Sequence, residues 1–407
     1  MTDINPSGPR RLHDELLQRE LSRRVLLRNA AGGALGLTAA GWLLGCGSDS
    51  GSGTTVAADS GDVGGTLNVL CWEGYTDPSF TKPFEKANNV KVNSTFIGSN
   101  DELVAKLRGA PDQFDLVSPS SDTTNLLIDN EQVQAINLDD VPNAKTTFEF
   151  FRTAPNVNVD GSLYGVPMCW GFIPLIYDED AIKTAPDSWE ALWDPQYEDS
   201  ISMWQDISML WTTGLLLGFD NVYEMSDDEL EQVKNKLIEQ KPNIRKYWTT
   251  AGELTNLFAN NEVVAGMSFG GLTVTQLRDQ GRNVTEIIPK EGATSWFDSW
   301  MITAQSQNTA TALAFLDHLN TPESQVKIAA ATGYGITNQN AVDKVPKEYA
   351  EVYHLEDPDF IAGLDYWKAV PDRQNAAIRS ANGLGNACCV KGLTGLNGRK
   401  RCSASLP

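Results

Sequence analysis

The sequence predicts an α/β fold that is large enough for two lobes. Between residues 66 and 117, short apolar segments of strand character alternate with amphipathic helical segments. This alternation is typical of a parallel sheet with helices on both faces. The same pattern returns between residues 164 and 289. The body from residue 66 to residue 374 holds about 310 residues, which suffices for two domains of ordinary size.

The first half of the body contains three expected strands and two expected helices. Apolar residues at helical spacing, such as Phe80 and Phe84, predict the first helix, and Ser99 or Asn100 caps the second. In chain order we expect a strand at 66–72, a helix around 80–87, a strand at 90–96, a helix at 101–107 and a strand at 114–117. Ligands of such sheets bind at the carboxyl ends of the strands, where residues 72–75 and 118–122 fall.

The second half repeats this organisation. Buried strands are indicated by continuous apolar segments, and the charged stretch at 227–240 indicates a helix on the surface. We expect strands at 172–177, 200–204, 262–269 and 285–289, and helices at 206–217, 227–240, 271–280, 310–318 and 324–331.

The first 46 residues have the features of an export signal. Arg23 and Arg24 lie in a twin-arginine pattern (SRRVLL), and an apolar stretch at 30–44 is shorter than the ~20 residues that span a bilayer. Leu43-Leu44-Gly45-Cys46 then reads as a lipobox, in which Cys46 receives a lipid. The alternative is a buried helix with a chance cysteine. We therefore expect a twin-arginine lipoprotein signal at 1–45 and a mature chain anchored by Cys46 to the outer face of the cytoplasmic membrane.

Composition describes the rest of the mature chain. Residues 46–65 are small and polar, and they are expected to form a flexible tether. The formal net charge is −21, and six arginines against four acids in the first 45 residues put the mature chain near −23. Such a surface repels nucleic acid and favours cationic ligands, although acidity can also serve solubility alone.

The sequence offers little for catalysis or for a cofactor. It has three histidines (His13, His318 and His354), and it lacks a metal-ligand spacing, a nucleophile motif or a phosphate-binding loop. Cys71 and Cys169 lie in apolar segments, where buried free thiols are expected. We therefore expect a binding protein with no cofactor and no metal. A secreted hydrolase and a sensor lipoprotein are the competing classes.

Several segments in order resemble the substrate-binding proteins of bacterial polyamine (spermidine/putrescine) ABC importers. They extend from Leu67 to about Asn340, and they are Trp72-Glu-Gly-Tyr75, Phe114-Asp-Leu-Val-Ser-Pro-Ser120, Tyr164-Gly-Val-Pro with Trp170-Gly171, Ser188–Tyr197, Pro289-Lys-Glu-Gly292 with Trp296-Phe-Asp-Ser299, and Gly333-Tyr334. The resemblance implies a periplasmic-binding-protein-like fold of type II, with a mainly parallel sheet in each lobe. It assigns 66–171 plus 297–342 to the first lobe and 172–296 plus 343–376 to the second.

The resemblance also implies a ligand and a partner. The protein would bind a small cation such as a polyamine, close on it like a clamp and deliver it to an ABC permease, as a monomer. Asp298 and Asp206 match carboxylates that bind amines in the family, and aromatic residues line its cleft. The expected ligand-binding residues are Trp72, Glu73, Tyr75, Asp122, Asp206, Phe269, Trp296, Asp298 and Tyr334.

Each of these residues also has a structural interpretation. A tryptophan or tyrosine in a two-lobed protein can simply belong to a core, and Asp206 can cap the helix that it precedes. The chain also departs from the family pattern. Gly74 and Met209 stand where the family has acids, and no tyrosine lies near Asp122. A diamine, a guanidino compound or an amino-acid-like cation therefore fits as well as spermidine.

The end of the chain departs further. Residues 375–407 are rich in Gly, Asn, Ala and Cys, and from Arg373 onward there are six basic residues and no acid. The family continues into an amphipathic helix at this point. We expect 377–407 to be an atypical tail that is disordered or aberrant, with a functional basic arm as the alternative.

Overall fold

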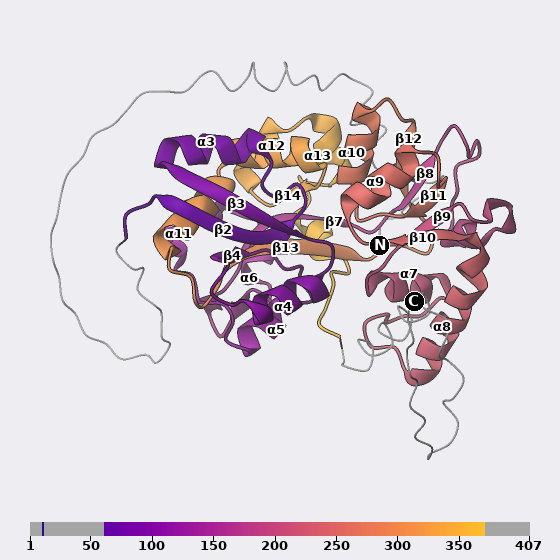
Figure 1. Cartoon of the computed structure of the whole chain (residues 1–407), viewed down its shortest axis with the longest axis horizontal. Coiled ribbons are helices and arrows are strands. Elements are labelled where there is room, and N and C mark those ends of the chain that lie inside the picture. Colours follow the sequence, from indigo (N-terminus) through magenta and orange to yellow (C-terminus); the bar gives the residue numbers. More distant parts are fainter. Residues whose placement is uncertain (1–9, 12–60, 371–407) are drawn as a thin grey trace, which may run out of the picture.

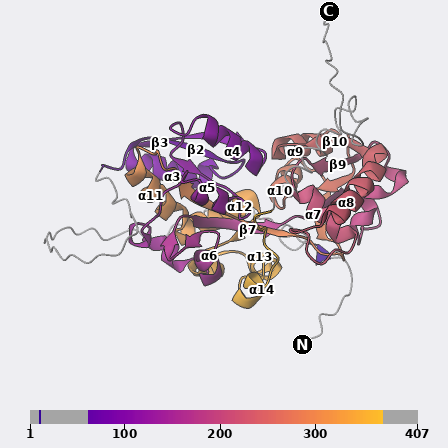
Figure 2. The same cartoon turned by 90° about the horizontal axis from the view of Figure 1, so that it is seen from below.

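The computed structural model describes Arg10–Arg11 and residues 61–370. The expected export signal at Arg23 and Arg24, the lipidation site Cys46 and the atypical tail lie outside the described residues. The described chain forms two lobes that lie side by side, each with its own sheet and helices (Figures 1 and 2). The two-lobed α/β fold that the sequence predicts is therefore confirmed.

The first lobe is built on a six-stranded sheet. Strand β2 is parallel to both of its neighbours, β4 and β3, because helices return the chain to the same end of the sheet. The strand order is β14 (Gly335–Ile336), β7 (Val166–Phe172), β13 (Ser295–Ile302), β4 (Leu116–Val117), β2 (Gly65–Trp72) and β3 (Val90–Ile97). A separate two-stranded sheet pairs β5 (Asn158–Val159) with β6 (Ser162–Leu163).

The second lobe has a six-stranded sheet of similar design. Here β9 is parallel to its two neighbours, β10 and β11. The strand order is β1 (Arg10–Arg11), β12 (Val284–Ile288), β8 (Leu175–Asp178), β11 (Ala265–Met267), β9 (Ile201–Trp204) and β10 (Ile244–Trp248).

Both sheets are mixed, which corrects the expectation of mainly parallel sheets. In each sheet three strands run parallel, and the remaining neighbours pair antiparallel. The antiparallel pairs include β13 on β4 and β8 on β11. The strand–helix alternation in the sequence reports only strands that a helix connects. It contains no signal for β13, which enters the first sheet from the other lobe.

Helices cover the faces of both sheets, and their ends follow local signals. Ser99 caps α4 through the backbone N–H of Glu102, as expected, and Ser226 forms a capping box with Glu229 at the start of α8. In the first lobe the helices are α3 (Pro78–Asn88), α4 (Asn100–Gly109), α5 (Thr124–Asp129), α6 (Glu149–Thr153), α11 (Thr309–Leu319), α12 (Pro322–Thr332), α13 (Lys347–Val352) and α14 (Pro358–Ala362). In the second lobe they are α7 (Ser208–Leu216), α8 (Asp227–Gln240), α9 (Ala251–Ala259) and α10 (Leu272–Asp279).

Short 3-10 helices complete the two lobes. They are η1 (Leu138–Asp140), η2 (Pro142–Thr146), η3 (Trp189–Trp193), η4 (Pro195–Tyr197), η5 (Lys241–Asn243) and η6 (Gln339–Lys344). Cys71 and Cys169 are buried free thiols, as the sequence indicates. Within residues 61–370, none of the helices has the length and apolar character needed to cross a membrane.

Three segments connect the lobes. β7 continues through Ile173 and Pro174 into β8, and residues 289–294 lead from β12 back to β13. The third segment comes near the end of the described chain, where Trp367 donates its backbone N–H to the oxygen of Ser295 at 2.8 Å. The expected lobe bounds put crossings near Gly171 and Trp296, where the structure has them, and a third near residue 342, which the structure has about twenty residues later.

Residues 343–362, expected in the second lobe, pack on the first. The ring of Tyr353, just after α13, lies 5.2 Å from that of Trp170 in β7, and α14 contacts α6. Only beyond this segment does the chain reach the second lobe, where Trp367 contacts Trp211 with ring centroids 5.3 Å apart. The resemblance placed this segment only by chain order, whereas its tyrosine side chains are buried by rings of the first lobe.

Candidate ligand-binding cleft

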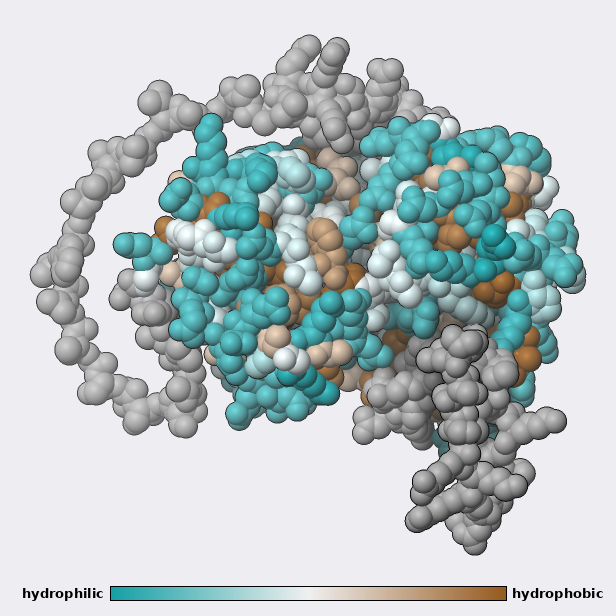
Figure 3. Space-filling view, viewed as in Figure 1, coloured by the Kyte–Doolittle hydropathy of each residue, from teal (hydrophilic) through white to brown (hydrophobic). Residues whose placement is uncertain are grey.

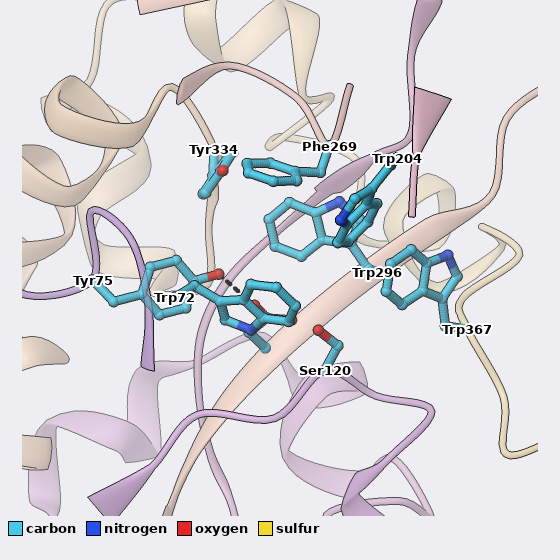
Figure 4. Close-up of a pocket in the computed structure, with 9 residues that line it drawn as sticks. Trp72, Tyr75, Ser120, Trp204, Phe269, Trp296, Tyr334 and Trp367 are labelled. Carbon is cyan, nitrogen blue, oxygen red and sulfur yellow. Dashed lines mark hydrogen bonds between the residues drawn. The ribbon is translucent and has the colours of Figure 1, made fainter. Parts of the chain in front are cut away.

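A pocket lies between the lobes, at the carboxyl ends of the parallel strands. It encloses about 270 Å³ of space free of protein atoms, part of it open to solvent. Both lobes and the third crossing contribute to its walls. The lining residues are Trp72, Tyr75, Ser120, Trp204, Phe269, Trp296, Asp298, Tyr334 and Trp367 (Figure 4).

Asp298 is the acidic residue among these lining residues. Its side chain is 3% exposed, and its Oδ2 accepts a 2.5 Å hydrogen bond from the hydroxyl of Tyr75. Its other oxygen, Oδ1, is buried and has no partner in the described structure. Burial raises the pKa of Asp298 to about 7, against the lowering effects of the Tyr75 and Ser120 hydroxyls. The carboxylate is therefore costly to keep ionised until a donor reaches Oδ1.

Two hydroxyl groups border the same space. Ser120 follows β4, and Tyr334 follows Gly333 at the end of α12 (Figure 4). Burial, followed by the charge of Asp298, raises the pKa of the Tyr75 hydroxyl, so that Tyr75 stays a donor at neutral pH. Together with Oδ1 of Asp298, the oxygens of Ser120 and Tyr334 can accept the three N–H bonds of a primary ammonium group.

Aromatic rings form the rest of the wall. Trp296 and Tyr334 meet edge to face at 4.8 Å, and Trp72 from the first lobe lies 6.0 Å from Trp204 of the second. Trp204 in turn stacks on Trp248 at 5.2 Å, which fixes its plane. Such walls suit the methylene chain of an amine and also attract a cation through the ring faces.

The register of β13 directs Asp298 and Trp296 into the cleft. In a strand, residues two apart lie on the same face, so Trp296 and Asp298 point together. Phe297 points to the opposite face, where its ring packs on Phe151 at 5.3 Å. The pairing with β7 shifts directly after Asp298, which indicates a β-bulge of the kind that reorients side chains next to binding sites.

Gly171, at the end of β7, makes room for a ring of the binding wall. This packing role does not conflict with backbone freedom at a hinge between the lobes. In the structure a Cβ at Gly171 would lie 2.8 Å from Cζ2 of Trp296, so the absence of a side chain makes room for the indole ring. The Trp296 ring then donates its N–H to the oxygen of Phe172 at 3.2 Å.

Two more acids approach the cleft without lining the pocket. Asp122, on the first lobe, accepts a 2.9 Å hydrogen bond from Asn100. Asp206, on the second, accepts hydrogen bonds from the N–H and the hydroxyl of Ser208 at 3.0 and 2.8 Å. Burial and then the charge of Asp206 raise the pKa of Asp122 well above its usual value, and burial raises that of Asp206 to about 6. In the described part of the chain neither acid forms an ion pair, and burial favours their neutral forms until a cation approaches.

The lobes also touch each other directly. Glu73 accepts a 3.2 Å hydrogen bond from the N–H of Gly252 in the first turn of α9, across the cleft. Trp204 donates its ring N–H to the oxygen of Gly98 at 3.1 Å. The backbones of Gly271 and Gly333 are so close that a Cβ on Gly271 would lie 2.6 Å from the Gly333 oxygen. The lobes are therefore in a closed arrangement.

Sequence comparison assigns this architecture to a family. The model of the bacterial extracellular solute-binding proteins matches residues 79–357, more than half of the chain. The chain belongs to this family. The match extends over most of both lobes of the solute-binding protein and over the first two connecting segments, and it ends before the third.

Curated relatives of this solute-binding protein include two from Escherichia coli. A spermidine/putrescine-binding periplasmic protein is 27% identical over 299 residues, which cover 72% of this chain and 84% of the relative. A putrescine-binding periplasmic protein is 27% identical over 305 residues, with 70% and 81% covered.

Solved structures show the same fold with different ligands named. A putative spermidine/putrescine ABC transporter protein from Listeria monocytogenes aligns with a TM-score of 0.71 at 23% identity, covering 79% of this chain and 99% of the other. A binding protein from A. tumefaciens, in complex with glucopine, aligns at 0.63 and 18% identity, covering 78% and 99%. At these identities the likeness establishes the fold and leaves the ligand to the pocket itself.

The structure brings most of the expected site residues of the solute-binding protein together. Trp72, Tyr75, Phe269, Trp296, Asp298 and Tyr334 line one pocket. Glu73, Asp122 and Asp206 lie outside this pocket. Glu73 belongs to the direct contact between the lobes, and Asp122 and Asp206 are the two acids beside the pocket. Three lining residues were missed: Ser120, Trp204 and Trp367. Ser120 follows β4 and Trp204 ends β9, so their places at the ends of strands could have indicated them. No local sequence signal indicates Trp367.

The outer faces of the lobes contrast with the pocket. Mostly hydrophilic residues cover the face seen in Figure 3, and hydrophobic residues show through where the lobes meet. Within the described residues, no group of three or more His, Cys, Asp or Glu is arranged to hold a metal ion.

Proposed function

We propose that this protein binds a small organic amine in the interlobe pocket and delivers it to an ABC permease. The observation that carries the proposal is the unpartnered Oδ1 of Asp298, buried in a pocket of aromatic rings. A buried carboxylate oxygen needs a donor, and an ammonium group supplies both the hydrogen bond and the opposite charge. Binding without turnover fits a family of solute-binding proteins.

Polyamines are the class of amine that we favour. The names of two curated relatives include putrescine, and one of them includes spermidine. In addition, Asp122 and Asp206 lie beside the pocket, and a multivalent cation that approaches them would favour their charged forms and be held by them. Closure of both lobes around such a ligand would remove the ammonium group from water while Asp298, Ser120 and Tyr334 replace its hydration.

A second candidate is an amino-acid-like solute. The ring nitrogen of Trp72 is a buried donor without a partner in the described structure, and Trp72 also lines the pocket. A ligand that carries an acceptor in addition to its ammonium group would satisfy both Trp72 and Asp298. γ-Aminobutyrate, which has a carboxylate and an amine four bonds of chain apart, represents this class in an experiment.

Calorimetry and thermal unfolding of the purified protein test the proposal. Putrescine, cadaverine, spermidine, γ-aminobutyrate, arginine and a neutral sugar form the panel. A ligand at 100 times its Kd should add about 2.7 kcal/mol to the free energy of unfolding. We expect amines to stabilise the protein and the sugar to have no effect. Stabilisation by the sugar alone would contradict the proposal, and a preference for γ-aminobutyrate over the diamines would favour the second candidate.

Asp298→Asn and Asp206→Asn form a matched pair for the same measurement. Loss of a buried charged partner costs about 2–5 kcal/mol of binding free energy, so the Asp298 variant should bind amines at least tenfold more weakly. Asp206→Asn should have a smaller effect, because the oxygen of Asp206 that Ser208 contacts already serves the start of α7. If Asp298→Asn binds amines as well as the unmodified protein, Asp298 is not the ammonium site.

We further propose that a lipid on Cys46 holds the protein at the outer face of the cytoplasmic membrane. The support is the order of the twin-arginine pattern, the apolar stretch and the lipobox in residues 22–46. Cys46→Ala should abolish labelling by a palmitate analogue, and Arg23→Lys with Arg24→Lys should block export. Unchanged labelling of the alanine variant would overturn the lipid anchor. Unchanged export in a strain without twin-arginine translocation would overturn the route.

A further inference from the structure

The third crossing between the lobes contributes a side chain to the pocket. Tyr366 pairs with Ser295 in a parallel bridge, and Ser295 donates its N–H to the oxygen of Asp365 at 3.0 Å. Asp365 also accepts a 3.0 Å hydrogen bond from the hydroxyl of Tyr223 in the second lobe. These bonds hold residues 365–367 against Ser295 at the start of β13, next to Trp296 and three residues before Asp298. Trp367 is thereby placed at the pocket wall.

The indole of Trp367 is held in one orientation. Its ring N–H donates to Oγ1 of Thr294 at 2.9 Å, and the side chain is 3% exposed. Its ring contacts Trp211 at 5.3 Å and Trp204 at 6.1 Å, both in the second lobe. Because its only polar atom is occupied, Trp367 presents an apolar face to the pocket.

The two ends of the pocket differ in chemistry. At one end Tyr75 binds Asp298, and at the other end lie Trp204 and Trp367 (Figure 4). The ring N–H of Trp204 is also occupied, by the oxygen of Gly98. The lining of the tryptophan end contains no acid. Asp206, two residues after Trp204, lies outside the lining, and its Oδ1 already accepts two hydrogen bonds from Ser208. A ligand anchored by its ammonium group at Asp298 therefore extends toward an aromatic wall.

We propose that Trp367 is a specificity-determining residue that closes this end of the pocket and limits the length of the amine. This inference rests on the proposed function, since it takes an amine at Asp298 as its starting point. A short diamine fits between Asp298 and the indole faces, where a second ammonium group meets ring faces. A longer triamine would have to displace Trp367 or leave a charged nitrogen in an apolar wall, which is unfavourable without a partner.

The test measures affinity against chain length in three proteins. Diamines of three to six methylene groups and spermidine are titrated calorimetrically into the unmodified protein, Trp367→Ala and Trp367→Phe. n-Butylamine is added to show how much the second ammonium group contributes. Trp211→Phe is the matched control, because Trp211 packs on Trp367 but does not line the pocket. Thermal unfolding without ligand shows whether each variant is folded.

We expect the unmodified protein to prefer short diamines and Trp367→Ala to shift the preference toward longer chains. One methylene group in an apolar pocket is worth about 10- to 200-fold in discrimination, so the ratio of the spermidine Kd to the putrescine Kd should fall at least tenfold in Trp367→Ala. Trp367→Phe keeps a ring at the wall and should keep most of the preference. Trp211→Phe should leave the ratio unchanged.

A negative result for the proposed function can be distinguished from a negative result for Trp367. If no amine binds the unmodified protein, the proposed function is wrong. If amines bind and every variant that remains folded shows the same length profile, or loses affinity equally for all chain lengths, Trp367 does not set length and the inference is overturned. If Trp367→Ala does not fold, the decision rests on Trp367→Leu, a smaller apolar side chain with the same expected shift.

Discussion

At the scale of single residues, the properties of Asp298 depend on its surroundings more than on its charge. A carboxylate in water has a pKa near 3.9. In the cleft, burial raises the pKa to about 7, and the Tyr75 hydroxyl opposes this rise only in part. Asp298 is therefore poised to change charge near neutral pH when a cation arrives. Ligand binding and proton release should be coupled at this residue.

This coupling predicts opposite effects of pH on ligand binding and on stability. Below pH 7 Asp298 in the unliganded closed protein is protonated and must lose a proton to pair with an ammonium group, so amine affinity should fall as the pH is lowered from 8 to 5.5. Without ligand, Asp298 is more protonated in the folded protein than in the unfolded chain between about pH 4 and 7. The contribution of Asp298 to stability should therefore decrease as the pH rises through this range and become level above it.

Asp298→Asn isolates the contribution of this group. The difference between the unfolding free energies of the variant and the unmodified protein should grow with pH, by at most on the order of 4 kcal/mol. Urea unfolding at pH 4, 5.5, 7 and 8 gives the comparison. Burial also raises the pKa values of Asp206 and Glu286, and these contributions are common to both proteins and cancel in the difference. Asp122 cancels only in part, because the charge of Asp298 contributes to its raised pKa. Parallel pH profiles for the two proteins would show that Asp298 is not buried as the structure has it.

At the scale of secondary-structure elements, the contact between β7 and β13 sets the geometry of the binding wall. The Trp296 ring lies over Gly171, and its N–H is held by Phe172. Phe297, between Trp296 and Asp298, packs into the aromatic core on the opposite face. Consequently a substitution in β7 can displace the Trp296 ring in the pocket, although no side chain of β7 lines the pocket.

Gly171→Ala should displace the Trp296 ring and weaken amine binding. The added Cβ would lie 2.8 Å from the ring, and overpacking of this kind costs about 1–3 kcal/mol. We expect affinity to fall about 5- to 100-fold, together with a change in tryptophan fluorescence or near-ultraviolet circular dichroism. Gly109→Ala, at an open position near the end of α4, is the matched control. Equal affinities in both variants would show that the ring position does not matter for binding.

At the scale of the whole molecule, closure depends on contacts between the lobes as well as on the ligand. Glu73 of the first lobe meets the first turn of α9 in the second, where unpaired backbone N–H groups and the helix dipole favour a carboxylate. The bond exists only when the lobes are together. A ligand that contacts both lobes shifts the population toward this closed form.

Small-angle X-ray scattering checks the closure. Saturating ligand should reduce the radius of gyration of the unmodified protein. Glu73→Gln should raise the radius without ligand and weaken binding about two- to fivefold, because a carboxylate at a helix N-terminus contributes about 0.3–1 kcal/mol. Glu231→Gln, on the exposed face of α8, serves as the control. A scattering profile that ligand leaves unchanged would show that the lobes do not move or that the ligand contacts one lobe only.

The sequence by itself determined the α/β class, most of the elements and much of the pocket. Strand periodicity and caps such as Ser99 are local signals, so the lengths and ends of helices such as α8 follow from them. The ordered motifs, through a family resemblance, pointed to Asp298, Trp296, Trp72 and Tyr75. These residues lie next to or within strands whose carboxyl ends meet at the cleft.

Only the tertiary structure decided what depends on distant parts of the chain. Three features join segments that are far apart in sequence. They are the antiparallel pairing of β13, the packing of 343–362 on the first lobe and the position of Trp367 at the pocket. The contacts of Glu73, Asp206 and Gly171 also come from the tertiary structure, because each depends on one particular neighbour: Gly252, Ser208 or Trp296. The residue type and the local pattern limit the roles that a side chain can have. Its burial and the atoms that it contacts decide which of these roles it has in the folded protein.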